Sequence, residues 1–563
     1  MHLLDDHCIT LGVCYYPEHW DPSLWREDLD RMLKSGLTVI RIAEFAWNKI
    51  EPREGVFDFS FFDGFLDLCD EVGMQVILGT PTATPPIWLT EKYPEVCNCL
   101  KDGTRLGHGM RRHYNYNSPV YQEKTRIIVT QMAKHYGKRT CVIGWQIDNE
   151  FNCEIGEFYS DSDTIAFRRF LREKYGSLEE LNSAWGTAFW NQTYTDWEEV
   201  HLPLPTPSGG TNPHQLLDYK HFISDSVYRY ARLQSEILRQ YRKRDDFITT
   251  NGIFGDIDYN RLVPEVLDFI TYDSYPNFGY CLDSYDPDPA AMRDRHWSWN
   301  LAKVRAISPV FGIMEQQSGA NGWDTRMEAP TPRPGQIRLW TLQSIAHGAD
   351  YVGYFRWRTS TIGTEIYWHG ILDYSGRENR RLREIREIAR QVKRLQALAG
   401  SRSSARVGNL QDYDNLWDAE CDHWHARVQY RSEDGLFAAL QHTHTSYDIV
   451  TLTSGMDHRD LEQYEVLFYP HPVILEQEQA EVLTEYVRHG GNLIFGCRSA
   501  YKDANGRCVQ DFLPGVIAEL TGTDIPEYSF IAPDAGEVSV TWEDDAFPAA
   551  VFTDLLEPLQ GGE

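Results

Sequence analysis

This sequence lacks the features of a membrane, secreted or nucleic-acid-binding protein. Its 563 residues contain no apolar run of about 18 residues, so no membrane-spanning helix is predicted. Residues 1–7 have neither a basic nor a long apolar stretch, and we expect no signal peptide. Basic residues number only 54 against 83 acidic ones, a net charge of −29. Such a surface repels phosphate backbones and anionic lipid, so we predict no nucleic-acid and no membrane partner.

Cysteine is also sparse and irregularly spaced. Eleven cysteines are scattered along the chain. An odd count without framework spacing predicts reduced thiols, no disulfides and a cytoplasmic location. A glycine-rich phosphate loop is missing too, because residues 14–20 read Cys-Tyr-Tyr-Pro-Glu-His-Trp after the first predicted strand. This argues against an open dinucleotide-binding sheet.

The first 400 residues do contain a regular alternation of strands and helices. Short apolar runs rich in β-branched and aromatic residues predict strands buried on both faces. Amphipathic segments lie between them, and several end in glycine. Eight such strands indicate an α/β protein with a (β/α)8 TIM barrel. The strands are predicted at 11–16, 38–45, 75–80, 142–147, 247–253, 268–272, 310–314 and 351–357, and the helices at 22–34, 61–71, 121–136, 164–175, 214–242, 290–306, 335–347 and 380–399.

The composition changes after about residue 400. Residues 401–422 are polar, and we predict an irregular segment there. A second α/β unit follows, with a flavodoxin-like or amidotransferase-like sheet. We therefore place the TIM-barrel domain at 1–398 and the α/β domain at 399–563. Residues 558–563 show no closing element, which leaves open that this domain is incomplete at its C-terminus. Its strands are predicted at 438–441, 446–452, 464–469 and 492–495, and a helix at 476–489.

Two of the predicted barrel strands end in a glutamate. Residues 141–150 end in Glu150, and residues 309–317 place Glu315 at the end of strand seven. The carboxyl ends of barrel strands form one face, where the active sites of barrel enzymes lie. Two carboxylates facing one sugar can cleave a glycosidic bond, at about 5–5.5 Å apart in retaining enzymes and about 6.5–9.5 Å in inverting ones.

Other interpretations of these carboxylates stay open. Alternation along a strand predicts Asp148 and Glu150 on one face and Asn149 on the other. An Asn-Glu pair after a strand is also common as a helix cap, and Glu315 could form a salt bridge at the rim. Three further carboxylates could replace one of the chosen pair, namely Glu44, Glu154 and Asp273.

Six motifs occur in order along the chain: Tyr-Tyr-Pro-Glu-His-Trp at 15–20, Arg-Ile-Ala-Glu-Phe-Ala-Trp at 41–47, Thr-Pro-Thr-Ala-Thr-Pro-Pro-Ile-Trp-Leu at 80–89, Trp-Gln-Ile-Asp-Asn-Glu-Phe at 145–151, Met-Glu-Gln at 314–316 and Trp-His-Gly at 368–370. With them the chain resembles glycoside hydrolase family forty-two, the bacterial β-galactosidases. The resemblance covers the whole barrel and extends into the second domain.

The resemblance implies a retaining β-galactosidase that releases terminal non-reducing β-D-galactose from small β-galactosides. Glu150 would be the general acid/base and Glu315 the nucleophile. The resemblance also implies a homotrimer, with 399–563 as the assembly domain and each subunit completing its neighbour's active-site wall. Sugar contacts are implied for Arg41, Asn149, Tyr275, Trp323, Glu365 and His369.

Some members of that family carry a cysteine cluster for zinc after the acid/base. Here residues 151–159 contain only Cys153, and Cys97 and Cys99 lie upstream. Three loop thiols are too few for a structural site with four cysteines. We predict no metal and no cofactor.

Three rival functions remain. One is another barrel glycosidase, such as an α-L-arabinopyranosidase, whose sugar lacks the 6-hydroxymethyl group of galactose. A second is a non-hydrolytic sugar-binding barrel, which would need neither Glu150 nor Glu315. A third is an amidohydrolase acting through Cys497, against which stand the bulky Arg498 and the absence of an evident partner histidine in the sequence.

Overall fold

The structure is a computed structural model that describes residues 8–283, 287, 292, 295–536, 538–542 and 544–559. The expectations for the chain ends, at 1–7 and 560–563, lie outside the described residues. Contacts between Cα atoms divide the chain into two compact units, residues 1–166 with 223–403 and residues 167–222 with 404–563. The domain boundary that we predict between 398 and 399 remains a proposal.

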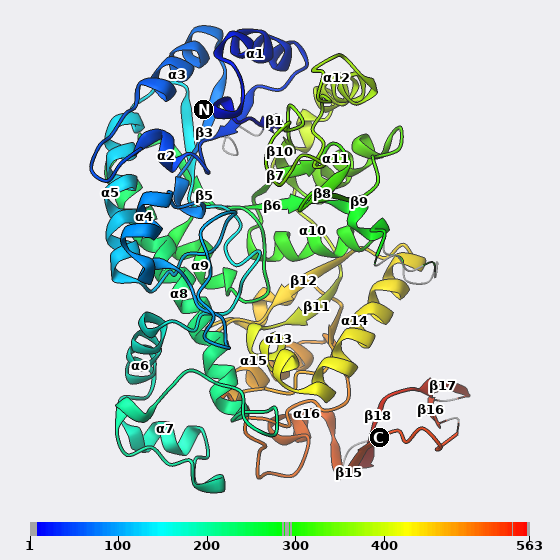
Figure 1. Ribbon diagram of the computed structural model, residues 1–563. Helices are drawn as coiled ribbons and strands as arrows, with labels where there is room; N and C mark the ends of the chain where they lie inside the picture. The colour runs from blue at the N-terminus through cyan, green and yellow to red at the C-terminus, as the bar shows by residue number, and fades with distance from the viewer. Residues whose placement is uncertain are drawn as a thin grey trace. The chain divides into compact units, whose positions relative to one another are not determined.

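Eight parallel strands form the centre of the first unit, in the order β5-β4-β3-β2-β1-β10-β7-β6 (Figure 1). The two end strands are joined by a parallel bridge between Asn251 and Thr271 and by a 3.1 Å hydrogen bond from the Thr271 N–H to the Thr250 carbonyl. The sheet therefore closes on itself, which confirms the predicted barrel. Its strands are β1 Thr10–Cys14, β2 Val39–Ile42, β3 Gln75–Gly79, β4 Val142–Gln146, β5 Phe247–Thr249, β6 Ile270–Ser274, β7 Phe311–Gln317 and β10 Ala349–Phe355.

Every strand and helix predicted for the barrel region is present, with shifted ends. The largest differences are at α10, predicted from residue 290, whose first residues fall partly outside the described chain, and at α12, which ends seven residues early, at Val392 instead of 399. The helices are α1 Trp25–Lys34, α3 Ser60–Val72, α5 Pro119–Tyr136, α6 Asp161–Tyr175, α8 Pro213–Tyr241, α10 His296–Ile307, α11 Gln336–Ala346 and α12 Arg380–Val392.

The barrel interior is filled by side chains from its strands and their ends. Apolar layers of this kind make a barrel a packed core and leave its mouth for function. One buried cluster consists of Val39, Ile77, Ile143, Phe247, Phe269, Met314 and Tyr351.

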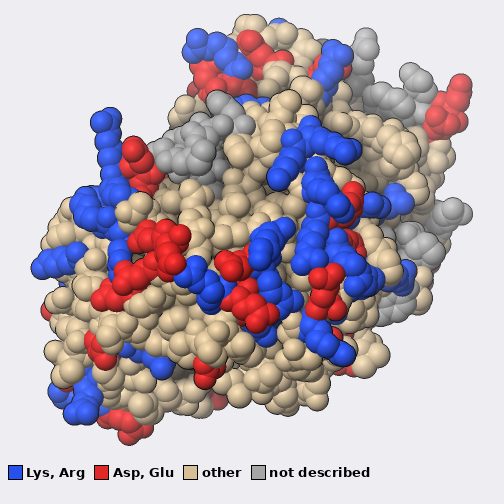
Figure 2. Space-filling model, turned by 90° about the horizontal axis from the view of Figure 1, so that it is seen from above, with Lys and Arg blue, Asp and Glu red and all other residues tan. Residues whose placement is uncertain are grey.

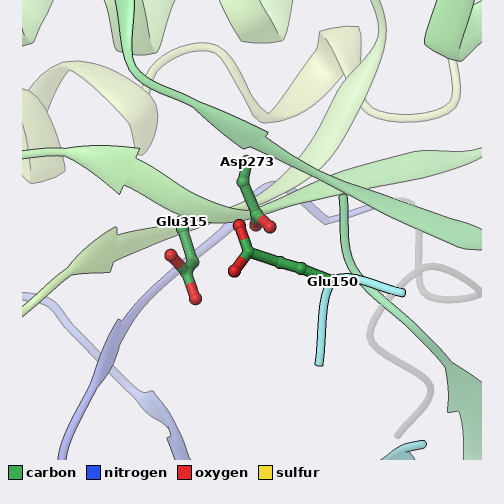
Figure 3. Close-up of side chains that lie close together, drawn as sticks. All are labelled: Glu150, Asp273 and Glu315. Atoms are coloured by element: carbon green, nitrogen blue, oxygen red, sulfur yellow. The ribbon is translucent and has the colours of Figure 1, made fainter. Parts of the chain in front are cut away.

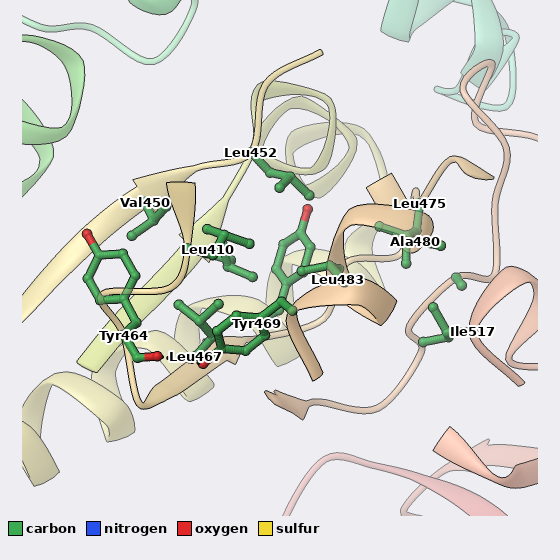
Figure 4. Close-up of a cluster of buried hydrophobic side chains, with 13 residues drawn as sticks. Leu410, Val450, Leu452, Tyr464, Leu467, Tyr469, Leu475, Ala480, Leu483 and Ile517 are labelled. Atoms are coloured by element: carbon green, nitrogen blue, oxygen red, sulfur yellow. Dashed lines mark hydrogen bonds between the residues drawn. The ribbon is translucent and has the colours of Figure 1, made fainter. Parts of the chain in front are cut away.

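The second unit contains a parallel four-stranded sheet in the order β12-β11-β13-β14. This order and the helices α13 Tyr413–Cys421, α14 His423–His442 and α15 Gln477–Arg488 make it flavodoxin-like, as predicted. Figure 4 shows its apolar core, in which Leu410, Leu467 and Leu483 are at most 2% exposed. The strands are β11 Val407–Gln411, β12 Tyr447–Thr451, β13 Val466–Tyr469 and β14 Asn492–Phe495.

The strand predicted at 438–441 is wrong, because these residues belong to the helix α14. Phe437 and Leu440 are both buried, and their spacing of three puts them on one helix face. A run of four mostly apolar residues does not distinguish helix from strand by periodicity.

The irregular segment predicted at 401–422 is also wrong, since it contains both β11 and α13. β11 is the central strand, paired with β12 and β13. It buries Asn409, which is 1% exposed, and the polar residue hides the apolar pattern of a central strand.

Two antiparallel strand pairs follow the sheet, β15 Thr523–Phe530 with β18 Phe552–Pro558 and β16 Val538–Trp542 with β17 Asp545–Ala549. They present large apolar side chains to solvent. Concentrated apolar exposure of this kind marks a contact surface. The exposed residues are Tyr528, Phe530, Val540, Phe547, Leu555 and Leu556.

The surface carries both signs of charge. Figure 2 shows acidic and basic side chains interspersed on the face seen from above, so the net negative charge is not gathered into one patch there. Within the described residues, no helix is long and apolar enough to cross a membrane. All eleven cysteines are free.

Candidate active site

The chain turns sharply where β4 ends. Asp148, Glu150 and Asn152 have φ angles of 53°, 47° and 64°, in the left-handed region that is costly for residues other than glycine. This turn interrupts the alternation predicted for Asp148 and Glu150. Asp148 accepts hydrogen bonds from Thr82 Oγ1 at 2.6 Å and from the Tyr114 hydroxyl at 2.8 Å. The Glu150 carboxyl group instead lies beside those of Asp273 and Glu315.

Glu315 lies within β7, which continues three residues beyond its predicted end. Arg41 Nη2 donates to Glu315 Oε1 at 2.6 Å, and the Tyr275 hydroxyl donates to Oε2. Arg41 also pairs with Glu44, at 2.9 Å, and is fully buried. Three strands and their ends thus hold the Glu315 carboxylate in one orientation.

The two predicted glutamates meet at one place, and Asp273 joins them. Figure 3 shows the three carboxyl groups converging. Glu150 comes from the loop after β4, Asp273 from β6 and Glu315 from β7. One oxygen from each lies within 4.8 Å of the others. Their exposures are 7% for Glu150, 9% for Asp273 and 4% for Glu315. One oxygen of Glu150 and one of Glu315 lie within 4.8 Å of each other, which is consistent with the carboxyl spacing of about 5–5.5 Å in retaining enzymes.

Burial and neighbouring charges set the protonation of the three groups. Burial raises the pKa of Glu315 to about 7, although Arg41 lowers it. Burial alone would raise the pKa of Glu150, but Arg111 foremost, with Arg112, outweighs it and lowers that pKa. Burial, followed by the charges of Glu315 and Glu150, raises the pKa of Asp273 well above its usual value. In this structure Glu150 is therefore ionised, opposite to the state that a general acid needs.

Arg111 is a residue beside the carboxyl groups that the sequence analysis missed. Its Nη2 lies 2.8 Å from Glu150 Oε2, and its guanidinium stands 5.7 Å from the Phe45 ring centroid and 5.2 Å from that of Trp323. Arg111, Phe45 and Trp323 line a cavity of about 350 Å³. The available signal was a pair of adjacent arginines in the long loop after β3 of an acidic chain.

The structure divides the other predicted sugar contacts into three groups. Trp323 and Glu365 line the cavity, and Glu365 pairs with Arg356 at 2.8 Å. Arg41 and Tyr275 donate hydrogen bonds to the Glu315 carboxylate, and Asn149 donates one to the Glu150 carboxylate.

Asn149 Nδ2 donates to Glu150 Oε2 at 3.0 Å, and its Oδ1 accepts from Arg41 and from Asn251. His369 faces Asp373 and the Tyr374 hydroxyl, at 3.7 and 3.2 Å, rather than the carboxylates.

Glu150, Asp273 and Glu315 are also the one group in the described part of the chain whose oxygens come close enough to hold a metal ion. Arginines already supply the positive charge, Arg41 to Glu315 and Arg111 to Glu150. The three carboxyl groups therefore suit protons and guanidinium partners better than a metal cation. The alternative carboxylates Glu44 and Glu154 lie outside this group of three, but they share its arginines: Arg41 also pairs with Glu44, and Arg111 also pairs with Glu154.

One expectation in the second unit needs correction. We expected no partner histidine for Cys497, but the fold brings His471 Nδ1 to 3.6 Å from its Sγ. The two residues are 26 positions apart in the sequence, so no local motif indicates their contact. Burial raises the pKa of Cys497 to about 12 and lowers that of His471 to about 4, so the thiol stays neutral and is not an activated nucleophile.

A closed barrel with two buried glutamates facing each other at its mouth defines a glycoside hydrolase. Residues 14–395 match the family described as Beta-galactosidase, and residues 405–562 match the Beta-galactosidase trimerisation domain. The chain belongs to this β-galactosidase family, glycoside hydrolase family forty-two, as its motifs predict.

Characterised relatives and solved structures agree. The chain is 34% identical to Beta-galactosidase BgaH of Haloferax lucentense, over 98% of this chain and 82% of that protein. It is 36% identical to BgaA of Thermus sp, over 94% and 81%. The β-galactosidase structure from the Antarctic haloarchaeon Halorubrum lacusprofundi superimposes with a TM-score of 0.89 at 34% identity, over 98% of this chain and 82% of that one.

Replacing Arg111 by glutamine should raise the pKa of Glu150, because the nearest positive charge is removed. Glu150 and Asp273 lie close enough to titrate as a pair, so the alkaline limb of kcat/KM against pH reports loss of the one proton that the pair holds. We expect this limb to move upward by about 1 unit, measured with a nitrophenyl β-galactoside. Arg105→Gln is the matched control, since Arg105 is an exposed arginine of the same loop. An unmoved or lowered limb in Arg111→Gln would contradict this electrostatic account.

Proposed function

We propose that this chain is a retaining β-galactosidase that releases terminal non-reducing β-D-galactose from small β-galactosides through a covalent galactosyl-enzyme. The observation that carries the proposal is the approach of a Glu150 oxygen and a Glu315 oxygen to within 4.8 Å. Curated relatives named β-galactosidases, which align over most of the chain, support the sugar.

In the first step the Glu315 carboxylate attacks the anomeric carbon while Glu150 protonates the departing oxygen. Arg41 and Tyr275 hold Glu315 in place and favour its charged form. In the second step Glu150 takes a proton from water, and the resulting hydroxide releases the sugar from Glu315. Esterified Glu315 is neutral, so its repulsion no longer raises the pKa of Glu150 during this step.

The sugar contacts follow from the cavity and from the family. Trp323 offers a flat ring face, and Glu365 offers a carboxylate at the cavity wall. We assign the 2-hydroxyl to Asn149, and the 4- and 6-hydroxyls to Glu365 and His369. Arg41 and Tyr275 act on the sugar through Glu315.

No observation favours the rival functions. An α-L-arabinopyranosidase would use the same carboxylates, and the relatives are named for galactosides. A non-hydrolytic binder has no use for two buried, facing glutamates. The neutral Cys497 thiol argues against an amidohydrolase.

The two roles can be separated by substitution. Glu315→Gly should lose activity by at least about 1,000-fold and regain it with azide, giving the α-galactosyl azide, because azide fills the nucleophile's place. Glu150→Gln should lose on the order of 100-fold or more on substrates with poor leaving groups and little on activated ones. In the wild-type enzyme kcat/KM should rise with pH through about 7, as Glu315 ionises.

Glu157→Gln serves as the control, because Glu157 is an exposed glutamate in the loop after β4. Full activity in either Glu150→Gln or Glu315→Gly would refute the assigned roles.

We further propose a homotrimer, supported by the match of residues 405–562 to the trimerisation domain and by the exposed apolar side chains of β15 to β18. Light scattering should give a mass about three times 65.2 kDa. Leu555→Asp should weaken the assembly, whereas Leu339→Asp should not, although Leu339 on α11 is even more exposed, at 63% against 51%. A wild-type mass of one subunit would disprove the trimer.

We propose the cytoplasm as its location, which the eleven free thiols support. Cell fractionation tests this, and activity found mainly outside the cytoplasmic fraction would contradict it.

A further inference from the structure

Asp273 is a buried carboxyl group to which the two-glutamate mechanism assigns no role. It lies on β6, where its Cα pairs with that of Glu315 on β7. Asn251 Nδ2 donates to its Oδ2 at 2.8 Å, which fixes the carboxyl plane. Its Oδ1 is buried, and no donor among the described residues reaches it. Asp273 is only 9% exposed, and a buried oxygen without a hydrogen-bond donor destabilises the folded protein. Such an oxygen in a native structure therefore needs an explanation.

The neighbour of Asp273 is Glu150. Figure 3 shows the two carboxyl groups directed at each other, and one oxygen of each lies within 4.8 Å of the other. Two buried carboxyl groups this close repel each other strongly when both are ionised. One of the two therefore keeps a proton, as in other buried carboxyl pairs. Asn251 holds both partners, because its Oδ1 also accepts from the Glu150 N–H at 3.1 Å.

The surrounding charges decide which partner keeps this proton. On the Glu150 side, Arg111 lies at 2.8 Å and Arg112 at 3.8 Å, and both favour a carboxylate. On the Asp273 side lie Glu315 and, more weakly coupled, Arg41, whose Nη2 is already engaged by Glu315 and Glu44. Other titratable side chains near the pair are neutral because burial raises their pKa values, namely Tyr275, Cys14, Tyr272 and Cys153. Glu154, near Glu150, is paired with Arg111 and Arg112.

We propose that Asp273 is a positioning residue that stores the proton which Glu150 delivers to the leaving group. This inference rests on the proposed galactosidase mechanism. In the free enzyme Asp273 is the acid and Glu150 the carboxylate.

Arg111 stands where a sugar ring would stack on Trp323, 5.2 Å from the ring centroid. A bound substrate displaces its guanidinium, and the proton then moves from Asp273 Oδ1 to Glu150.

The proton balance closes over both steps. Asp273 gives its proton to Glu150, Glu150 gives it to the departing alkoxide, and Glu315 becomes a neutral ester. The site then holds two carboxylates, Asp273 and Glu150, as it held two, Glu150 and Glu315, before the reaction. In the second step water gives its proton to Glu150, which returns it to Asp273 as Glu315 regains its charge.

The test is Asp273→Asn, which keeps the shape and can donate to Glu150 but cannot release a proton. Activity is measured on methyl β-galactoside, whose leaving group needs an acid, and on dinitrophenyl β-galactoside, whose leaving group does not. We expect kcat/KM to fall by about 100-fold on the first and by less than about 3-fold on the second. The alkaline limb of the pH profile should move to lower pH, opposite to its shift in Arg111→Gln.

Asp273→Glu, which restores a carboxylic acid, should recover part of the lost activity on the methyl galactoside. Asp268→Asn is the matched control. Asp268 precedes the same strand and accepts from the Ile248 N–H at 2.7 Å, so it reports the cost of a purely structural aspartate. Thermal unfolding of each variant shows whether the fold is retained.

Equal losses on both substrates with an unmoved alkaline limb would overturn the proposal, as would full activity of Asp273→Asn on the methyl galactoside. If Asp273→Asn does not fold, the pH profile of Asp273→Glu decides, and an alkaline limb that stays at the wild-type position overturns the proposal. Failure of the proposed function looks different, because the wild-type enzyme would then hydrolyse neither galactoside or Glu150→Gln would lose nothing.

Discussion

Three carboxyl groups buried within 4.8 Å of one another are the constraint to which the rest of this site responds. Negative charge gathered away from water is costly unless it is paired or neutralised by a proton. Both solutions occur here. Arg41 stabilises Glu315 from within the barrel, Arg111 reaches Glu150 from a loop, and the raised pKa of Asp273 favours its protonated form. The different sources of charge give each carboxyl group its own protonation state, although the three lie side by side.

The barrel explains why these charges remain fixed. Glu315, Arg41 and Asp273 stand on strands or at their ends, where neighbouring strands hold the backbone. Glu150 and Arg111 stand on loops, and left-handed residues re-aim Glu150 away from the strand alternation. Glu315, Arg41 and Asp273 are thus fixed in position by the rigid part of the barrel, whereas Glu150 and Arg111, whose contact changes on substrate binding in the mechanism that we propose, stand on the more adjustable part.

The second unit differs from the barrel in how it exposes apolar side chains. Its parallel sheet buries a conventional apolar core, yet β15 to β18 leave large apolar side chains exposed. Such a surface is costly in water for an isolated chain. The exposed residues and the match to the trimerisation domain therefore both support the proposed homotrimer. Cys497 and His471 meet in this unit without either being charged, so proximity alone does not create a nucleophile there.

Much of this protein could be predicted without coordinates. The β-branched and aromatic runs predicted all eight barrel strands, because strands buried on both faces need continuous apolar sequence. The motifs around Glu150 and Glu315 predicted the family and the two carboxylates. The strand at 438–441 failed, since four apolar residues fit either period, and β11 escaped notice because it buries Asn409. Arg111, Asp273 and the His471 contact with Cys497 come from remote segments. Only tertiary structure could decide them, because the distance between charged groups, and hence where a proton resides, is set by how strands and loops meet in space.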